Sequence, residues 1–134
     1  NARIMEFNLI LALEAFQTAI NLEPNFWEAI NNKGIVLFEM GSPQKAIISW
    51  RNALYITKNP EPMLALAAAL YQIKNNNQES LELAKKALSQ NPNYVSSKYQ
   101  EEQLWGYKLQ QATKELLESP DLKYDVSRAL ENSN

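Results

Sequence analysis

The chain has 134 residues, 13 of them basic and 15 acidic, for a formal net charge of −2, and it contains no cysteine. Scattered charges of both signs exclude the positive field that draws proteins to nucleic acid or anionic membranes, so neither partner is expected. The lack of cysteine excludes disulfides and thiol chemistry, and it favours a reducing intracellular compartment such as the cytoplasm or a plastid stroma.

Length and composition predict a single all-α domain. Apolar residues make up 46% of the chain, enough for one ordinary core, and there are only three glycines. Alanine, leucine, glutamate, glutamine and lysine, which all favour helix, are abundant, whereas valine and threonine are sparse. No apolar run approaches the ~20 residues needed to cross a bilayer, so we expect no membrane-spanning segment.

Helical periodicity predicts paired helices in the N-terminal half. Residues 1–7 read as the tail of a first helix and residues 9–22 as its partner, so we expect the chain to begin within a repeat. Residues 26–40 and 44–56 form the next pair. A Gly-Ser-Pro turn at 41–43 joins them, with the serine placed to cap the second helix and the proline at its first position.

The C-terminal half continues the pattern and then changes. Residues 63–74 and 78–89 read as a third helix pair, joined by an asparagine turn at 75–77. Residues 94–117 read as one long polar helix without a turn, which would cap the open end of the stack. A last short helix over 121–130 is expected to fold back on this cap.

The helix pairs recur with a period of 34 residues. Small side chains recur where two helix backbones would approach closely, and larger ones recur where they would fill the space between units. The aligned columns are Ala12, Ala46 and Ser80; Phe16, Trp50 and Ala84; Ala19, Ala53 and Ala87; and Ile20, Leu54 and Leu88.

Two helices in a 34-residue period resemble the tetratricopeptide repeat family. The family's small, large and proline positions are met in the second unit by Gly34, Leu37, Ala46, Trp50 and Ala53, and in the third by Ala68, Tyr71, Ser80, Ala84, Ala87 and Pro92. On this resemblance one domain comprises a truncated first repeat (1–26), a complete repeat (27–60), a third repeat (61–94) and C-terminal capping helices (95–134). The fold that it implies is an α-α superhelix of antiparallel helix pairs.

The family resemblance also implies a non-catalytic scaffold or adaptor. Members of the family bind a peptide or helix in a concave groove lined by the first helix of each repeat. Mapping those positions onto this chain places a partner-binding groove at Asn31, Ile35, Phe38, Glu39, Ala65, Ala69, Gln72, Ile73, Tyr99 and Gln103. We expect binding to fall sharply for Phe38→Glu.

The groove's composition indicates an apolar partner. Members that clamp a C-terminal carboxylate use lysine, arginine and asparagine, whereas these positions hold mainly Ile35, Ala65 and Ala69, so we expect an extended apolar peptide or an amphipathic helix. The segments 103–109 and 119–122 also resemble tails of cyanobacterial and plastid tetratricopeptide proteins, some of which assist photosystem assembly. On that resemblance the chain would be an assembly factor for a larger complex.

Catalysis, cofactors and metals are not expected. The sequence has no histidine, no cysteine, no glycine-rich phosphate loop and no nucleophile elbow, and its paired acids read as solvated helix faces. The alternative function is structural: a solenoid segment or oligomerisation module of a longer repeat protein. Self-association would then proceed through apolar surface near Phe7 and Phe16 in the truncated first repeat.

Overall fold

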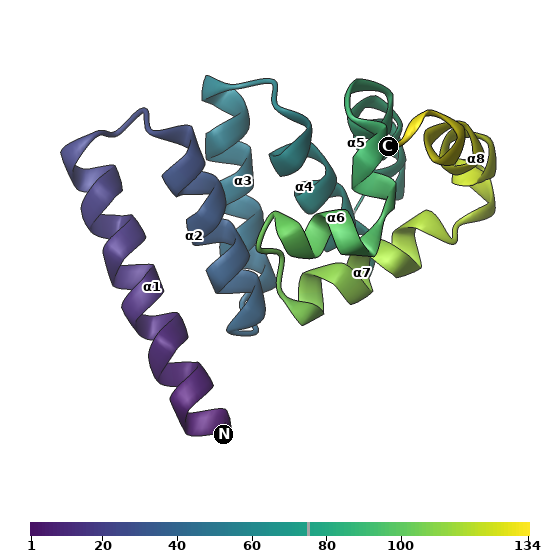
Figure 1. Ribbon diagram of the computed structural model, residues 1–134. Coiled ribbons are helices and arrows are strands. Elements are labelled where there is room, and N and C mark those ends of the chain that lie inside the picture. Colours follow the sequence, from purple (N-terminus) through teal and green to yellow (C-terminus); the bar gives the residue numbers. More distant parts are fainter. Residues whose placement is uncertain (75) are drawn as a thin grey trace.

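The computed structural model describes residues 1–74 and 76–134, and throughout these two ranges the regular structure is helical (Figure 1). This confirms the all-α class. Asn75, part of the predicted asparagine turn, lies outside the described residues. The elements are α1 (Ala2–Leu22), α2 (Trp27–Glu39), α3 (Pro43–Ile56), α4 (Pro60–Gln72), α5 (Asn77–Gln90), the 3-10 helix η1 (Pro92–Val95), α6 (Ser97–Glu102), α7 (Tyr107–Leu117), the 3-10 helix η2 (Pro120–Leu122) and α8 (Lys123–Asn132).

Helices α1 to α5 stand side by side, and each packs on the next along the chain (Figure 1). The α2–α3 turn shows why the chain reverses there. Gly41 has a φ of +86°, and the Ser42 and Gly41 N–H groups donate to the carbonyls of Leu37 and Phe38 at 3.0 Å each, which satisfies the end of α2. Pro43 then starts α3 as predicted, but the Ser42 side chain makes no capping hydrogen bond, so that part of the prediction is wrong.

Helix α4 lies at the centre of the molecule. Every residue from 62 to 70 is buried, because α3, α5 and α7 all pack on this helix. It begins at Pro60, three residues earlier than predicted, since the side chain of Asn59 accepts a hydrogen bond from the Glu61 N–H at 2.9 Å. Its alanines let the neighbouring backbones approach closely.

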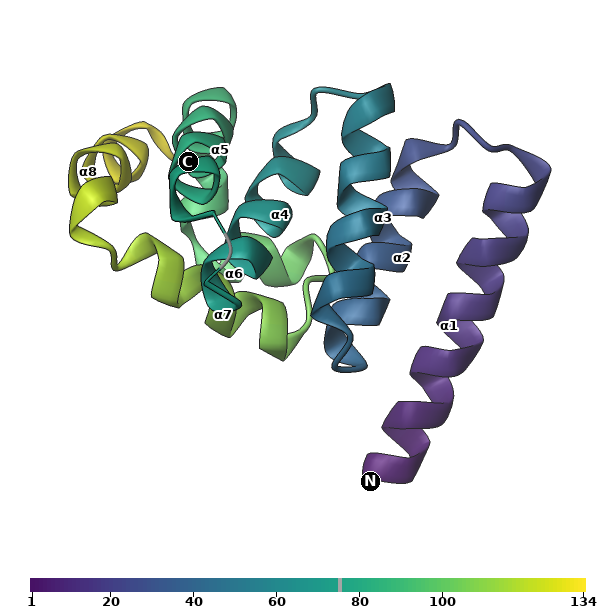
Figure 2. The same cartoon turned by 180° about the vertical axis from the view of Figure 1, so that it is seen from behind.

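Helix α1 is continuous from Ala2 to Leu22, so the predicted break between residues 7 and 9 is wrong. No glycine or proline interrupts this stretch, and helix propagation across it costs little. The C-terminal half of α1 packs on α2, while its N-terminal end extends past the ends of α2 and α3 (Figure 1 and Figure 2). Residues 1–8 are all exposed.

The single long helix predicted over residues 94–117 is also wrong. The chain instead forms η1, α6 and α7, with a turn at residues 103–106. There Leu104 adopts a φ of +68°, and the Trp105 N–H donates to the Gln100 carbonyl at 3.0 Å. The C-terminal region is still a helical cap, and α8 packs on α5 at the end of the stack opposite α1 (Figure 1).

Within the described ranges, none of the helices combines the length and hydropathy of a membrane span.

Candidate functional site

The concave face predicted as the partner groove is covered by the chain's own helix α7. Leu109 and Leu116 of α7 are fully buried, and so are Ala65 and Ala69 of α4, on which this helix packs. Phe38 of α2 is only 4% exposed. Figure 1 shows α6 and α7 crossing this face of the stack beside α4 and α2. The predicted floor of the groove is therefore core in this structure.

Glu39, a second predicted groove residue, holds α7 in place. Its carboxylate oxygens accept hydrogen bonds from the backbone N–H groups of Lys108 (3.1 Å) and Leu109 (2.9 Å). These are unsatisfied donors of the first turn of α7, where the helix dipole also favours a negative charge. A side chain at Gly106 would overlap the Glu39 side chain, so a larger residue at the start of α7 would displace the carboxylate from these N–H groups.

Glu61 of α4 anchors the segment that precedes α7. The Trp105 indole N–H donates to one carboxylate oxygen at 3.0 Å, and the Tyr94 hydroxyl donates to the other at 3.3 Å. Trp105 is 2% exposed, and burial together with the nearby Glu61 charge raises the pKa of Tyr94. The carboxylates of Glu39 and Glu61 are thus both used in hydrogen bonds within the chain.

The remaining predicted residues lie around α6 and α7. One hollow of about 230 Å³ is lined by Asn31 and Gln103, and Asn31 Oδ1 has no hydrogen-bond partner within the described chain. A second hollow of about 480 Å³ is lined by Phe38 and Gln72. The other members are buried or half-buried: Ile35 and Glu39 on α2, Ile73 after α4, and Tyr99 on α6. The structure therefore does not bring the ten residues together as one open groove.

A larger groove, which the sequence did not predict, opens between α1 and α3 with α2 beneath it. We call it the α1–α3 groove. Its volume is about 810 Å³, and its lining is Leu13, Glu14, Gln17, Ile20, Pro24, Ile30, Lys33, Leu37, Lys45, Ile48, Ser49, Asn52, Tyr55 and Ile56. Its α2 residues lie on a different face of that helix from Phe38, because positions 30, 33 and 37 share one face and each step along a helix turns the side chain by about 100°.

One wall of the α1–α3 groove consists of apolar side chains exposed on α3. Ile48 is 60% exposed, Tyr55 89% and Ile56 40%. The 34-residue repeat offers an internal comparison, because the same positions in α5 hold Glu82, Ser89 and Gln90. Polar residues are therefore compatible with these positions of the repeat, and the apolar wall is a particular feature of α3.

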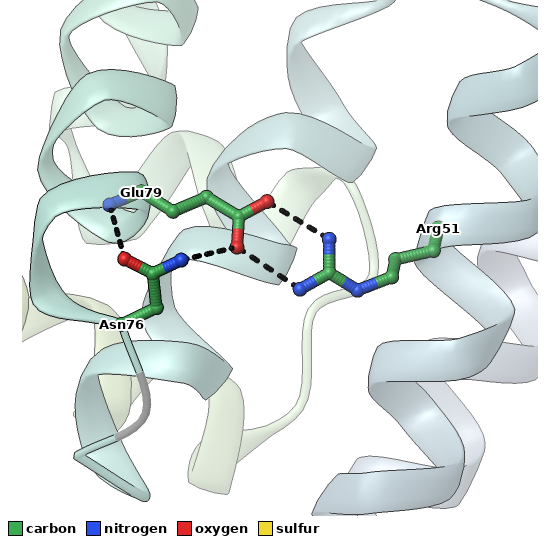
Figure 3. A network of polar contacts seen from close by, with 3 residues as sticks. All are labelled: Arg51, Asn76 and Glu79. Carbon is green, nitrogen blue, oxygen red and sulfur yellow. Dashed lines mark hydrogen bonds and ion pairs between the residues drawn. The ribbon is translucent and has the colours of Figure 1, made fainter.

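The seams between α1 and α3 and between α3 and α5 also differ in their charges. Across the second seam, Arg51 of α3 makes a bidentate ion pair with Glu79 of α5, with N–O distances of 2.8 and 3.0 Å, and Asn76 also binds Glu79 (Figure 3). Across the first seam the equivalent positions are Gln17 and Lys45, which cannot form such a pair. Only the second seam is closed by an ion pair in the described chain.

Arg51→Gln, which copies the first seam into the second, is expected to destabilise the fold by about 0.5 kcal/mol, the usual scale for an exposed pair. The hydrogen bond from Arg51 holds the pKa of the Glu79 carboxyl below its usual value. A lowered carboxyl pKa contributes stability above the ordinary glutamate pKa, and this contribution disappears as the pH falls through the lowered value. Urea unfolding at neutral and acid pH measures the free energy of unfolding of variant and wild type. The difference between the two free energies should become smaller at acid pH, and an equal difference at both pH values would contradict this.

Within residues 1–74 and 76–134 no group of carboxylates is arranged to hold a metal ion. The α1–α3 groove offers apolar contact area, hydrogen-bonding groups and two lysines, and this combination suits the recognition of a protein.

Stacked helix pairs with an open apolar groove define an α-helical repeat protein of the scaffold class. Residues 15–48, a span that runs from α1 through α2 into α3, match the family model described as tetratricopeptide repeat. The chain thus carries a tetratricopeptide repeat, and the resemblance predicted from its sequence is confirmed. The span includes many of the α1–α3 groove residues.

A solved structure supports the same fold. The chain is similar to a protein whose structure is titled "Crystal structure of MamA", with a TM-score of 0.61, 16% sequence identity, and coverage of 97% of this chain and 81% of that one. At this identity the likeness shows a common fold. A comparison with curated proteins finds no match.

Proposed function

We propose that this chain is a non-catalytic scaffold that binds a helical segment of a partner protein in the α1–α3 groove. The general role of protein–protein interaction scaffold follows from the repeat and the fold. The observation that supports this particular groove is its exposed apolar wall of Ile48, Tyr55 and Ile56. Exposed apolar surface around a groove of this size is typical of a binding site.

The concave face is a poorer candidate because a partner would first have to displace α7. Doing so would expose Trp105, Leu109 and Leu116, which are at most 2% exposed. At about 1.5–3 kcal/mol for each large side chain, the cost is on the order of 5 kcal/mol, before the hydrogen bonds to Glu39 and Glu61 are counted. The α1–α3 groove needs no such rearrangement.

The dimensions of the α1–α3 groove suit a short helix. Its α3 wall runs from Lys45 to Ile56, about 16 Å or three helical turns. A partner helix with apolar residues at helical spacing would lay its apolar face against this wall and against Leu13 and Ile20 of α1. Nothing in the groove specifies a photosystem subunit, so we define the partner by this chemistry alone.

The test replaces the apolar wall with the residues that the next repeat carries. In the variant Ile48→Glu, Tyr55→Ser and Ile56→Gln, which we call the wall variant, every new side chain is already accepted at the same repeat position of α5. Peptides of about 18 residues, selected from a helical display library on the wild type, should bind the wall variant at least about tenfold more weakly. Its unfolding midpoint should stay close to that of the wild type.

Lys85→Ala and Lys86→Ala on α5 form a control, because both lysines are exposed and lie outside the groove. The control should bind the selected peptides as the wild type does. Equal affinity of wild type and wall variant would contradict the proposal.

Self-association through α1 stays a second proposal, because Ile4, Met5 and Phe7 are 58%, 66% and 59% exposed on its projecting end. Sedimentation over a range of concentrations would detect it. The wall variant should not change this association, because these three residues lie outside the α1–α3 groove.

A further inference from the structure

We propose that the partner segment is an amphipathic helix of about three turns whose apolar face carries one carboxylate, and that this carboxylate pairs with Lys33. The inference rests on the proposed function, since it names the occupant of the α1–α3 groove.

The first observation is the position of Lys33. It extends from α2 into the α1–α3 groove, where it is half-buried among the apolar residues Leu13, Ile30 and Leu37. Its ammonium nitrogen donates to the side-chain carbonyl of Gln17 at 2.7 Å. The acceptor is therefore a neutral amide, although the lysine side chain is a cation.

The second observation is that neither lysine of the groove forms an ion pair within the described residues. The ion pair between Arg51 and Glu79 is the only one in the part of the chain that the structure describes, so neither Lys33 nor Lys45 has a carboxylate within 4.0 Å there. Glu14 also lines the groove but makes no ion pair with either lysine in that part.

The repeat comparison shows where a carboxylate is missing. Across the α3–α5 seam an acid, Glu79, faces a base, Arg51. At the equivalent positions of the α1–α3 seam stand the base Lys45 and the neutral Gln17, which already binds Lys33. Two cationic side chains therefore line a seam that has no acid at the corresponding position, and neither forms an ion pair with the one acidic side chain of the groove lining, Glu14. A carboxylate brought by a partner would supply the missing ion pair.

Docking makes this charge decisive. A helix that covers the groove removes water from Lys33, and an ammonium that loses water without gaining an anionic partner is strongly unfavourable. A carboxylate on the apolar face of the partner would replace the lost hydration with a charge-assisted hydrogen bond. An otherwise identical helix with an uncharged or basic residue at that position would leave the ammonium desolvated, so charge at this point sets specificity.

The test uses a display library of peptides of about 18 residues with a fixed leucine stripe at helical spacing and one fully randomised position at its centre. It is selected in parallel on the folded wild-type chain, Lys33→Met, Lys33→Glu, the wall variant and Lys58→Glu. Lys58 lies outside the groove, so Lys58→Glu is the matched control for charge reversal. Sequencing before and after selection measures the residue preferred at the randomised position.

On the wild type and on Lys58→Glu we expect aspartate and glutamate to be enriched about tenfold over asparagine and glutamine. The preference should disappear on Lys33→Met and change to lysine and arginine on Lys33→Glu. Stripe peptides that are enriched on the wild type without any acid preference would overturn the inference and leave the proposed function intact. Stripe peptides that are retained equally by the wall variant would overturn the proposed function itself, and with it this inference.

Discussion

Gly34→Ala is expected to destabilise the protein by about 2 kcal/mol, although alanine normally favours a helix over glycine by about 1 kcal/mol. Gly34 lies in the middle of α2, facing α3. A Cβ at this position would lie 2.6 Å from Nε1 and 2.8 Å from Cε2 of Trp50. Trp50 is completely buried, and its indole N–H donates to the Asn31 carbonyl at 3.2 Å, so it has no free space to move into. Urea unfolding monitored by circular dichroism measures the change.

The next repeat supplies the control for this prediction. Ala68 occupies the repeat position of Gly34, and Ala84 occupies that of Trp50. In that unit the larger residue on the first helix, alanine in place of glycine, faces a smaller residue on the second helix, alanine in place of tryptophan. We therefore expect Gly34→Ala to stabilise the protein when it is introduced into a Trp50→Ala background, by about 0.5–1 kcal/mol. A stabilising effect of Gly34→Ala in the wild type would contradict the close approach of α2 and α3.

Phe38→Glu is expected to destabilise the protein by about 4 kcal/mol or more, a larger loss than that of Gly34→Ala. The Phe38 side chain is 4% exposed, and its ring centroid lies 5.9 Å from that of Trp50. A carboxylate there would have to enter a buried apolar position, and the contact of α7 with α2 would be disrupted. Thermal unfolding of the variant should therefore begin far below that of the wild type.

Gln72→Glu is the matched control, since Gln72 belongs to the same predicted surface but is exposed. It should leave stability nearly unchanged. If Phe38→Glu folded with wild-type stability, the concave face would be open rather than covered by α7. If Phe38→Glu is destabilised as we expect, the weaker binding predicted for it from the sequence would result from unfolding and not from a lost contact with the partner.

The helix pairs were predictable because strong local signals agree with the repeat. Gly41 and Pro43 mark the end of one helix and the start of the next, and the small residues at Ala46 and Ala53 recur with the period of 34. Both alanines are fully buried at the contact between helices. Local backbone chemistry and the requirements of close packing thus indicated the same architecture.

The division of the C-terminal cap was not predictable from such signals. Helix α6 ends with the same two backbone hydrogen bonds as α2, from the second and third residues after the helix back to carbonyls of its last turn. The residue with left-handed backbone geometry, however, is Leu104 instead of a glycine. A non-glycine residue rarely adopts this conformation. It is favoured here by the tertiary burial of Trp105 and Leu109, which a local pattern does not reveal.

The α1–α3 groove is not predicted by the sequence pattern for a related reason. The family resemblance directs attention to the concave face, but the chain covers that face with α7, whose apolar stripe resembles that of a solvating cap. A signal for the α1–α3 groove is nevertheless present in the sequence, because Ile48 and Tyr55 lie where the next unit has Glu82 and Ser89. Differences between repeats at exposed positions, rather than similarities, carry this signal.

Methyl-resolved NMR of the isotope-labelled protein, titrated with a selected helical peptide, tests the location of the binding site most directly. We predict that the methyl resonances of Leu13, Ile48 and Ile56 shift on binding, while those of Leu109 and Leu116 do not. Shifts at Leu109 and Leu116, with Ile48 and Ile56 unchanged, would place the partner on the concave face and contradict the account.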